Sequence, residues 1–157
     1  MNIKATIVPH QQGTPGWDQH RMRSLNASEL AVAMGISSNM QRNTLVKCKA
    51  TGIPFEHSDF VEKRVFAPGH EYEAIARPWA EEIIGEELYC SVFAAEVDGL
   101  YLSASLDGHT LLNEANMEHK QLNDELAESL DRGVIPEQYH PQMEQGQMLT
   151  GATLTLF

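Results

Sequence analysis

Two acidic residues and a lysine between residues 103 and 123 have types and a spacing that suit chemistry on a phosphate ester. Asp107 closes an apolar segment, Glu118 follows eleven positions later, and Lys120 comes two residues after Glu118. Alternate side chains of a β-strand share one face, so Glu118 and Lys120 are expected to point the same way. If the segments around Asp107 and Glu118 form a hairpin, both carboxylates and the ammonium converge on one point.

Such a convergence has a specific chemical use. Paired carboxylates hold Mg²⁺ through hard oxygen ligands, and Mn²⁺ can take its place. The metal polarises a phosphoryl oxygen and lowers the pKa of a bound water, which a nearby lysine can orient or deprotonate. The residues therefore predict Mg²⁺ as cofactor and a phosphodiester as substrate. The spacing alone is also compatible with a solvated hairpin whose charged side chains face water.

The elements that must position these residues are predicted as helices first and strands later. Helical patterns cover residues 15–25, a segment capped by Asn26 or Ser28 and ended by Gly35, residues 41–50, residues 69–85, Asn123–Leu130, and Glu137–Thr150 after Pro136. Strand patterns cover Leu88–Phe93, Leu100–Leu106, Ala115–Lys120 and Thr153–Phe157, with turns at Val97–Gly99 and Asp107–Gly108. Pro78 predicts a kink or a break near Arg77. This order predicts an α+β domain with a mixed central sheet flanked by helices.

The charge is strongly negative but unevenly distributed. The net charge of the 157 residues is −11. Nine basic and seven acidic residues give residues 1–77 a net of +2, and two basic and fifteen acidic residues give residues 78–157 a net of −13. A protein of this kind that binds a polyanion must concentrate its few cations or offset its carboxylates with metal. The alternative is that the acidic half is only a solvated surface.

The composition is that of a globular chain. Apolar residues make up 42% of the sequence, and no apolar run is long enough to span a bilayer. The N-terminal residues lack the pattern of a signal peptide, and two cysteines do not suggest a disulfide framework. We therefore expect one domain over residues 1–157 and no membrane partner.

Four sequence blocks occur in the order found in a known family. They are Q-G-T-P-G-W-D-Q-H-R-M-R-S-L-N-A-S-E at 12–29, G-H-E-Y-E-A-I-A-R at 69–77, S-L-D-G with M-E-H-K, and I-P-E-Q-Y-H-P-Q-M-E-Q-G-Q-M-L-T-G at 135–151. They resemble the blocks G-T-x-x-W-x-x-x-R…T-A-S-(E/D), G-x-x-x-E-x-x-A-R, P-D-G with (E/D)-x-K, and I-P-x-x-Y-x-x-Q-x-Q-x-Q-L-x-V-T-G. These are blocks of the YqaJ-type viral recombinase and lambda-type phage exonuclease family, within the PD-(D/E)xK nuclease superfamily. The resemblance implies a restriction-endonuclease-like core.

The resemblance also implies roles for individual residues. Asp107 and Glu118 would be the main metal ligands and Lys120 the catalytic lysine. Glu73 and the backbone carbonyl of His119 would complete the metal site. The residues implied for the terminal 5′-phosphate and the DNA are Arg21, Ser28, Ser105, Gln142 and Glu144. A guanidinium and a hydroxyl near a helix start suit a phosphate.

The chain departs from the family pattern in several places. Leu106 stands where proline is usual before Asp107, and His119 stands where an apolar residue is common. Glu144 occupies the place of a glutamine, and an ionised carboxylate cannot donate to a phosphate as an amide does. The sequence ends at Phe157, soon after T-G-A, so we expect a single nuclease domain that is short at its C-terminus relative to the family.

The resemblance implies a Mg²⁺-dependent deoxyribonuclease that digests linear duplex DNA from its ends, 5′ to 3′, in phage-type homologous recombination. Two alternatives remain open, a catalytically degenerate module that binds DNA ends and a structure-specific endonuclease with the same centre. The implied partners are duplex DNA ends, a homo-oligomer of the trimeric kind, and a protein that anneals single strands. The implied location is the cytoplasm of a bacterial host, with a phage or prophage origin.

Overall fold

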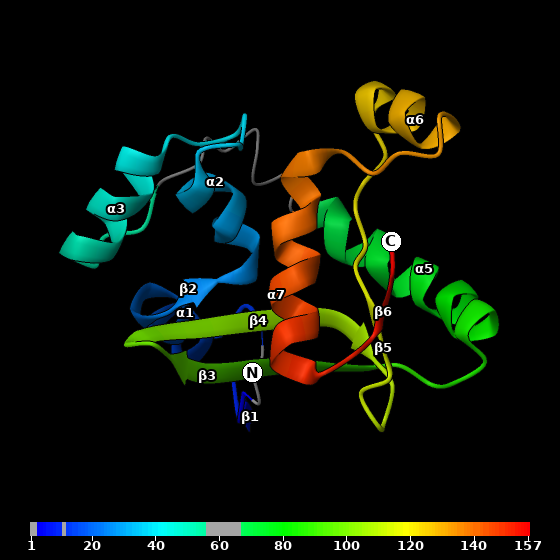
Figure 1. Ribbon diagram of the computed structural model, residues 1–157, viewed down its shortest axis with the longest axis horizontal. Helices are drawn as coiled ribbons and strands as arrows, with labels where there is room; N and C mark the ends of the chain where they lie inside the picture. The colour runs from blue at the N-terminus through cyan, green and yellow to red at the C-terminus, as the bar shows by residue number, and fades with distance from the viewer. Residues whose placement is uncertain (1–2, 11, 56–66) are drawn as a thin grey trace.

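The structure, a computed structural model, describes residues 3–10, 12–55 and 67–157, with only the backbone of residues 67–70. A curved sheet lies at its centre with helices around it (Figure 1). The strands are β1 (Thr6–Val8), β2 (Leu25–Asn26), β3 (Tyr89–Val97), β4 (Leu100–His109), β5 (Ala115–Met117) and β6 (Leu154–Leu156). The helices are α1 (Pro15–Arg23), η1 (Ala27–Glu29), α2 (Leu30–Met34), α3 (Arg42–Thr51), α5 (Ala67–Ile84), α6 (Asp124–Asp131), η3 (Glu137–Tyr139) and α7 (His140–Thr150).

The sheet is mixed, as the sequence predicts. Its strands follow the order β1-β3-β4-β5-β6, and β2 also pairs with β4. The predicted meander is present, because β3 pairs antiparallel with β4 and β4 pairs antiparallel with β5. Strand β6 adds parallel to β5, and β2 lies parallel to β4. The chain is therefore an α+β protein, and its longest strands are β3 and β4.

The helix boundaries follow local chemistry. Thr14 caps α1, with its side chain accepting a hydrogen bond from the Trp17 amide, and Pro15 stands at the first helical position. Asn26 and Glu29 form a capping box at the start of η1. Gly35 ends α2 in the left-handed conformation at φ 78°. Asn123 caps α6 through its side chain. The predicted caps at Asn26 and Gly35 are thus confirmed.

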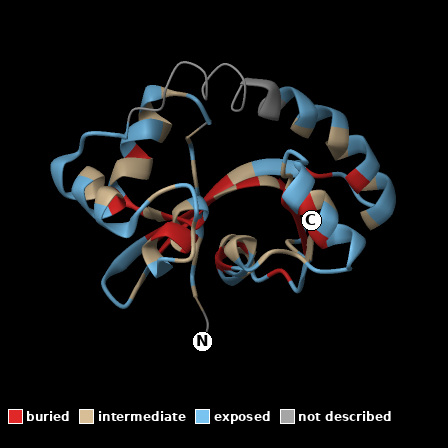
Figure 2. Ribbon diagram, turned by 90° about the horizontal axis from the view of Figure 1, so that it is seen from above, coloured by how far each residue is buried: buried red, intermediate tan, exposed pale blue. Residues whose placement is uncertain are grey.

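The core lies between the sheet and α7. Phe93 and Ala95 of β3 and Leu102, Ala104 and Leu106 of β4 pack in one buried cluster with Ala27 and Leu149. Figure 1 shows α7 crossing the sheet, with α2 and α3 toward one end of β4 and α5 and α6 toward the other. Buried residues gather along the central strands, whereas the outer helix faces are exposed (Figure 2). The sheet and α7 therefore form the rigid part of the molecule.

A β-bulge replaces the turn that we predicted at Asp107–Gly108. Tyr89 pairs with His109 and Ser91 with Leu106, so Asp107 and Gly108 together oppose the single residue Cys90. Strand β4 continues to His109, and the chain reverses after Thr110. The prediction of a turn was wrong because glycine marks bulges as well as turns. A bulge also redirects side chains, which matters here because Asp107 stands in it.

Three further predictions need correction. Strands β1 and β2 were missed, since each is too short to show a period. The segment Glu137–Thr150 divides into η3 and α7. Helix α5 runs unbroken past Pro78, so the expected break near Arg77 does not occur. In the part of the chain that the structure describes, no helix is long and apolar enough to cross a membrane.

Gln145 should be essential for stability although it lies in a predicted functional block. It is 2% exposed, and its Nε2 donates to the carbonyls of Leu25 and Ser103, each at 2.9 Å. Gln145→Leu leaves two buried carbonyls without a donor, which should lower the free energy of unfolding by about 2–4 kcal/mol. Urea denaturation measures this, with Gln147→Leu as the matched control on α7. Equal unfolding free energies for the two variants would contradict the assignment.

Candidate active site

Asp107 stands in β4, and Glu118 directly follows β5, which ends at Met117 and not at Lys120 as the sequence predicts. Gly108 pairs with Met117 and His109 with Asn116, so the next pair along this antiparallel register is Asp107 with Glu118. The Asp107 carboxylate accepts a hydrogen bond of 2.8 Å from the His119 amide. The Glu118 amide donates to the Leu156 carbonyl at 2.9 Å, which fixes Glu118 against β6. The hairpin condition for a shared carboxylate site is therefore met.

Lys120 and Gln142 both bind the Glu118 carboxylate. Lys120 Nζ donates to Glu118 Oε1 at 2.5 Å and to Gln142 Oε1 at 3.0 Å. Gln142 Nε2 donates to the same Glu118 oxygen at 2.5 Å. Tyr139 adds an aromatic ring whose centroid lies 5.9 Å from Lys120 Nζ. The lysine is thus held at a buried carboxylate by groups from α7 and from η3 beside it.

Burial makes this carboxylate difficult to ionise. Glu118 is 5% exposed. Burial raises the pKa of Glu118 to about 7, opposed by the Lys120 ammonium and assisted by repulsion from Asp107 and Glu73. Burial also raises the pKa of Asp107, against the hydrogen bond from the His119 amide and the charge of Lys120. Both carboxyl groups are therefore harder to ionise than in water, chiefly because they are buried.

Glu73 reaches the edge of this centre from α5. Its Oε1 forms an ion pair of 2.6 Å with Arg77 Nη2, one helical turn further along. Cys90, the residue opposite the bulge, donates from its thiol to the Asp107 carbonyl at 3.3 Å. Burial raises the pKa of the Cys90 thiol, and the charges of Arg77, Glu73 and Asp107 also act on it. Cys90 and Arg77 therefore lie close to Asp107.

The donor set suits a hard divalent cation. Two buried carboxylates with raised pKa values provide oxygen ligands and uncompensated negative charge, which Mg²⁺ or Mn²⁺ would neutralise. Among the described residues, no group of three His, Cys, Asp or Glu side chains is arranged to hold a metal ion. Asp107 and Glu118 therefore offer two carboxylates, and Mg²⁺ commonly uses one or two carboxylates with water. Glu73, expected as a further ligand, is paired with Arg77 in this structure.

The predicted phosphate residues come together around Trp17. Arg21 Nη2 donates to Ser28 Oγ at 3.2 Å, and the Arg21 guanidinium lies over the Trp17 ring, 4.7 Å from its centroid. The Trp17 indole donates to Ser105 Oγ at 3.0 Å. Ser105 precedes Asp107 by two residues on β4, a rise of about 6–7 Å along a strand. Strand β4 therefore connects the cluster of Arg21, Ser28 and Ser105 to the carboxylate centre.

The glutamine block separates into different roles. Gln142 lies in the carboxylate centre, as described above. Glu144 is exposed on α7 and makes no hydrogen bond or ion pair with any residue that the structure describes. Gln145 points into the core. Glu144 therefore contacts neither the carboxylate centre nor the Arg21 cluster in this structure, and its predicted role at DNA stays a prediction.

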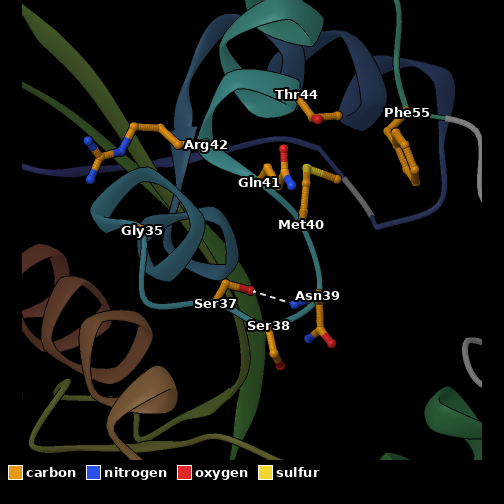
Figure 3. Close-up of a pocket in the computed structure, with 9 residues that line it drawn as sticks. All are labelled: Gly35, Ser37, Ser38, Asn39, Met40, Gln41, Arg42, Thr44 and Phe55. Carbon is orange, nitrogen blue, oxygen red and sulfur yellow. Dashed lines mark hydrogen bonds between the residues drawn. The ribbon is translucent and has the colours of Figure 1, made fainter.

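Two hollows lie near these residues. One, of about 260 Å³, is bounded by Glu118, His119 and Lys120 at one end and by apolar side chains of α5 and α6, among them Trp79, Ala80, Ile83, Leu126 and Leu130. The other, of about 440 Å³, lies between the start of α3 and Phe55 (Figure 3). Arg42 turns away from Phe55 in Figure 3 and donates to the Met34 carbonyl at 2.7 Å. The smaller hollow reaches Glu118 and Lys120, whereas Asp107 does not line it.

Sequence reasoning missed four contributors to the site. Trp17, which received no role in the sequence analysis, joins Arg21 to Ser105. Arg77, Cys90 and Tyr139 received no role at all. The position of Cys90 depends on the bulge, which a single sequence does not reveal. The E-x-x-x-R spacing of Glu73 and Arg77 was visible and predicts a pair on one helix face.

Solved structures of other proteins share the fold described above. The chain is similar to an alkaline exonuclease, LHK-Exo, from Laribacter hongkongensis, with a TM-score of 0.66 and 22% identity over 88% of this chain and 70% of that one. It is also similar to LHK-Exo in complex with dAMP, with a TM-score of 0.65 and 24% identity over the same shares. No curated protein sequence matches the chain significantly. The fold is thus the one found in lambda-type exonucleases.

The fold and the site together define a chain of the lambda-exonuclease-like class, with two carboxylates and a lysine at the ends of its central strands. The model of the YqaJ-like viral recombinase domain matches residues 16–153, most of the chain. The chain belongs to this family. The match confirms the resemblance that the four sequence blocks indicate.

Glu118 should make the metal-free protein less stable as the pH rises. Its pKa is about 7 in the folded protein, against an ordinary value of 4.5. Between these values the folded protein binds more protons than the unfolded chain, so the free energy of unfolding should fall with rising pH, by about 3 kcal/mol in total. Urea denaturation in EDTA at about pH 5 and pH 8 measures the fall in wild type and in Glu118→Gln. The same pH dependence in both proteins would show that Glu118 does not cause it.

Proposed function

We propose that the protein is a Mg²⁺-dependent DNA exonuclease that digests linear duplex DNA from 5′ ends during phage-type recombination. The observation that carries this proposal is the buried Asp107–Glu118 pair with Lys120 at 2.5 Å from Glu118. Membership of the YqaJ-like family and the likeness to an alkaline exonuclease support the nuclease class. The direction of digestion is expected from the family resemblance.

The proposed reaction divides the work among few groups. Asp107 and Glu118 would hold Mg²⁺, with Glu73 and the His119 carbonyl as further oxygen ligands. When bound, Mg²⁺ supplies Lewis-acid activation of the phosphodiester and of water. Lys120 sits where it can orient the attacking water and offset charge on the phosphate in the transition state. Gln142 holds the Lys120 ammonium, which keeps its donors aimed at this point.

The end-binding part of the proposal rests on the cluster around Trp17. Arg21 and Ser28 would bind a terminal 5′-phosphate, since a guanidinium and a hydroxyl donate to phosphate oxygens. Ser105 joins this cluster to the strand that carries Asp107. The solved complex of LHK-Exo with dAMP supports a nucleotide ligand for this fold. A phosphate held here would set the first phosphodiester near the carboxylates.

Assembly and partners follow from the family resemblance alone. We propose a ring-shaped homotrimer around duplex DNA. Residues 1–77, the more basic half of the chain, carry a net charge of only +2, so binding DNA would gain from three copies around the duplex. A single-strand annealing protein would receive the exposed strand, in the cytoplasm of a bacterial host. A module that binds DNA ends without cleaving them is the second candidate, favoured by the engagement of Glu118 with Lys120 and Gln142.

The nuclease assignment predicts that Asp107→Asn and Lys120→Met each reduce Mg²⁺-dependent digestion of linear duplex DNA by about 100-fold or more. The measurement is nucleotide release from linear and covalently closed DNA, with and without Mg²⁺. Asp98→Asn, in the exposed β3–β4 turn, is the matched control and should digest as wild type does.

The outcomes separate the candidate functions. Digestion of linear DNA alone supports the exonuclease, and cleavage of closed circles supports an endonuclease. Wild-type binding to DNA ends without release of nucleotides, in Mg²⁺ or Mn²⁺, would replace the enzyme with the binding module. Full activity in both variants would remove Asp107 and Lys120 from the centre.

The end-binding assignment predicts that Arg21→Gln abolishes the preference for 5′-phosphorylated over 5′-hydroxyl ends, a loss of about tenfold or more. The glutamine keeps a donor but not the charge. Digestion rates on the two kinds of end measure the preference, with exposed Arg23→Gln as control. An unchanged preference in Arg21→Gln would exclude Arg21 from the phosphate site.

A further inference from the structure

Arg77 is a charged residue beside the carboxylate centre to which the proposed reaction gives no role. It pairs with Glu73 on α5 at 2.6 Å, and the two side chains are 27% and 15% exposed. Burial is the main cause of the raised pKa of Asp107, and the Arg77 charge is among the effects that lower it. A guanidinium therefore stands within electrostatic reach of a proposed metal ligand.

The hydrogen bonding of Arg77 is incomplete. Its Nη2 binds Glu73, whereas its buried Nε has no hydrogen-bond partner in the part of the chain that the structure describes. A buried donor without an acceptor is unfavourable, so such a group calls for an explanation such as a ligand or a functional role. A guanidinium presents its donors as a fork that matches the oxygens of a carboxylate or a phosphate. Here the Glu73 carboxylate accepts from the Nη2 donor of this fork.

The position of Glu73 explains what Arg77 does. Glu73 with Asp107 and Glu118 does not form a three-ligand group, because no such group exists among the described residues. The Arg77-bound position of Glu73 is therefore not a ligating position. Glu73 is nevertheless close enough for its charge to act on Glu118, after the larger effects of burial, Lys120 and Asp107. Arg77 and a divalent cation are thus rivals for the same carboxylate.

We propose that Arg77 is an exchangeable counter-ion: it holds Glu73 in the metal-free protein, gives it up when the cation binds, and then binds a phosphate of the DNA strand. This inference rests on the proposed metal site and extends the proposed function with a substrate-binding residue. The released guanidinium would present its Nε and Nη2 donors to phosphate oxygens beside the cleaved bond, where the DNA backbone must lie.

An alternative role for Arg77 predicts the opposite change in metal affinity. A residue that merely orients Glu73 as a ligand would support metal binding, and its loss would weaken metal affinity by about 10–100-fold. Removal of a competing cation should instead strengthen metal binding, by about three- to thirtyfold after allowance for partial exposure. The direction of the change therefore distinguishes the two roles.

The test measures Mn²⁺ binding without DNA, by electron paramagnetic resonance of free Mn²⁺, for wild type, Arg77→Met and Arg77→Gln. Both variants should bind Mn²⁺ more tightly, and a thermal melt confirms that each folds. Arg77→Lys should bind like wild type because it keeps the charge. Arg132→Met, exposed at the end of α6, is the matched control and should not change Mn²⁺ affinity.

A second arm measures DNA affinity in Ca²⁺ by fluorescence anisotropy. Arg77→Met should bind a 5′-phosphorylated duplex about fivefold or more weakly, although its metal site is stronger. Weaker or unchanged Mn²⁺ binding in Arg77→Met and Arg77→Gln would overturn the counter-ion role, and unchanged DNA affinity would overturn the transfer to phosphate. Absence of Mn²⁺ binding in wild type would instead overturn the proposed metal site itself.

Discussion

The burial of the Glu118 carboxylate is the constraint on which the rest of the site depends. Strand β6 fixes its backbone, α7 brings Gln142 to it, and Lys120 follows it by two residues. A buried ion is costly unless it is paired and hydrogen-bonded, so these contacts are conditions for the fold as well as for chemistry. Asp107 then adds a second negative charge opposite Glu118. The result is a centre with more carboxylate than cation, which is the electrostatic setting that a divalent ion requires.

Strand β4 connects the two parts of the site. Its Ser103 and Ser105 receive contacts from α1, through His20 at 2.7 Å and Trp17 at 3.0 Å, and its bulge directs Asp107 toward β5. A strand within a packed sheet is stiff, so the distance between the Arg21 cluster and the carboxylates is set by the fold and not by a loop. Helix α5 approaches from the other end with Glu73 and Arg77. In the proposed function, end recognition and hydrolysis would both depend on this one strand held between two helices.

Much of this arrangement can be predicted from the sequence, for identifiable reasons. Helix caps depend on neighbouring residues, so Asn26 and Gly35 mark real boundaries. Lys120 does meet Glu118, but β5 ends at Met117, so the strand period that predicts this contact does not produce it. The four family blocks indicate the fold. The bulge at Asp107–Gly108 depends on the partner strand, and the link from Trp17 to Ser105 spans 88 positions. Glu144 shows the same limit, because the pattern gives its place in a block but not the direction of its side chain from α7.

The central claim is that Asp107 and Glu118 share a divalent cation. A crystal structure grown with Mn²⁺, with data collected for anomalous scattering from manganese, tests this most directly. One strong anomalous peak is expected within coordinating distance of both carboxylates, with Lys120 beside it. Both carboxylates still bound to the His119 amide and to Lys120, with manganese absent from the centre, would contradict it.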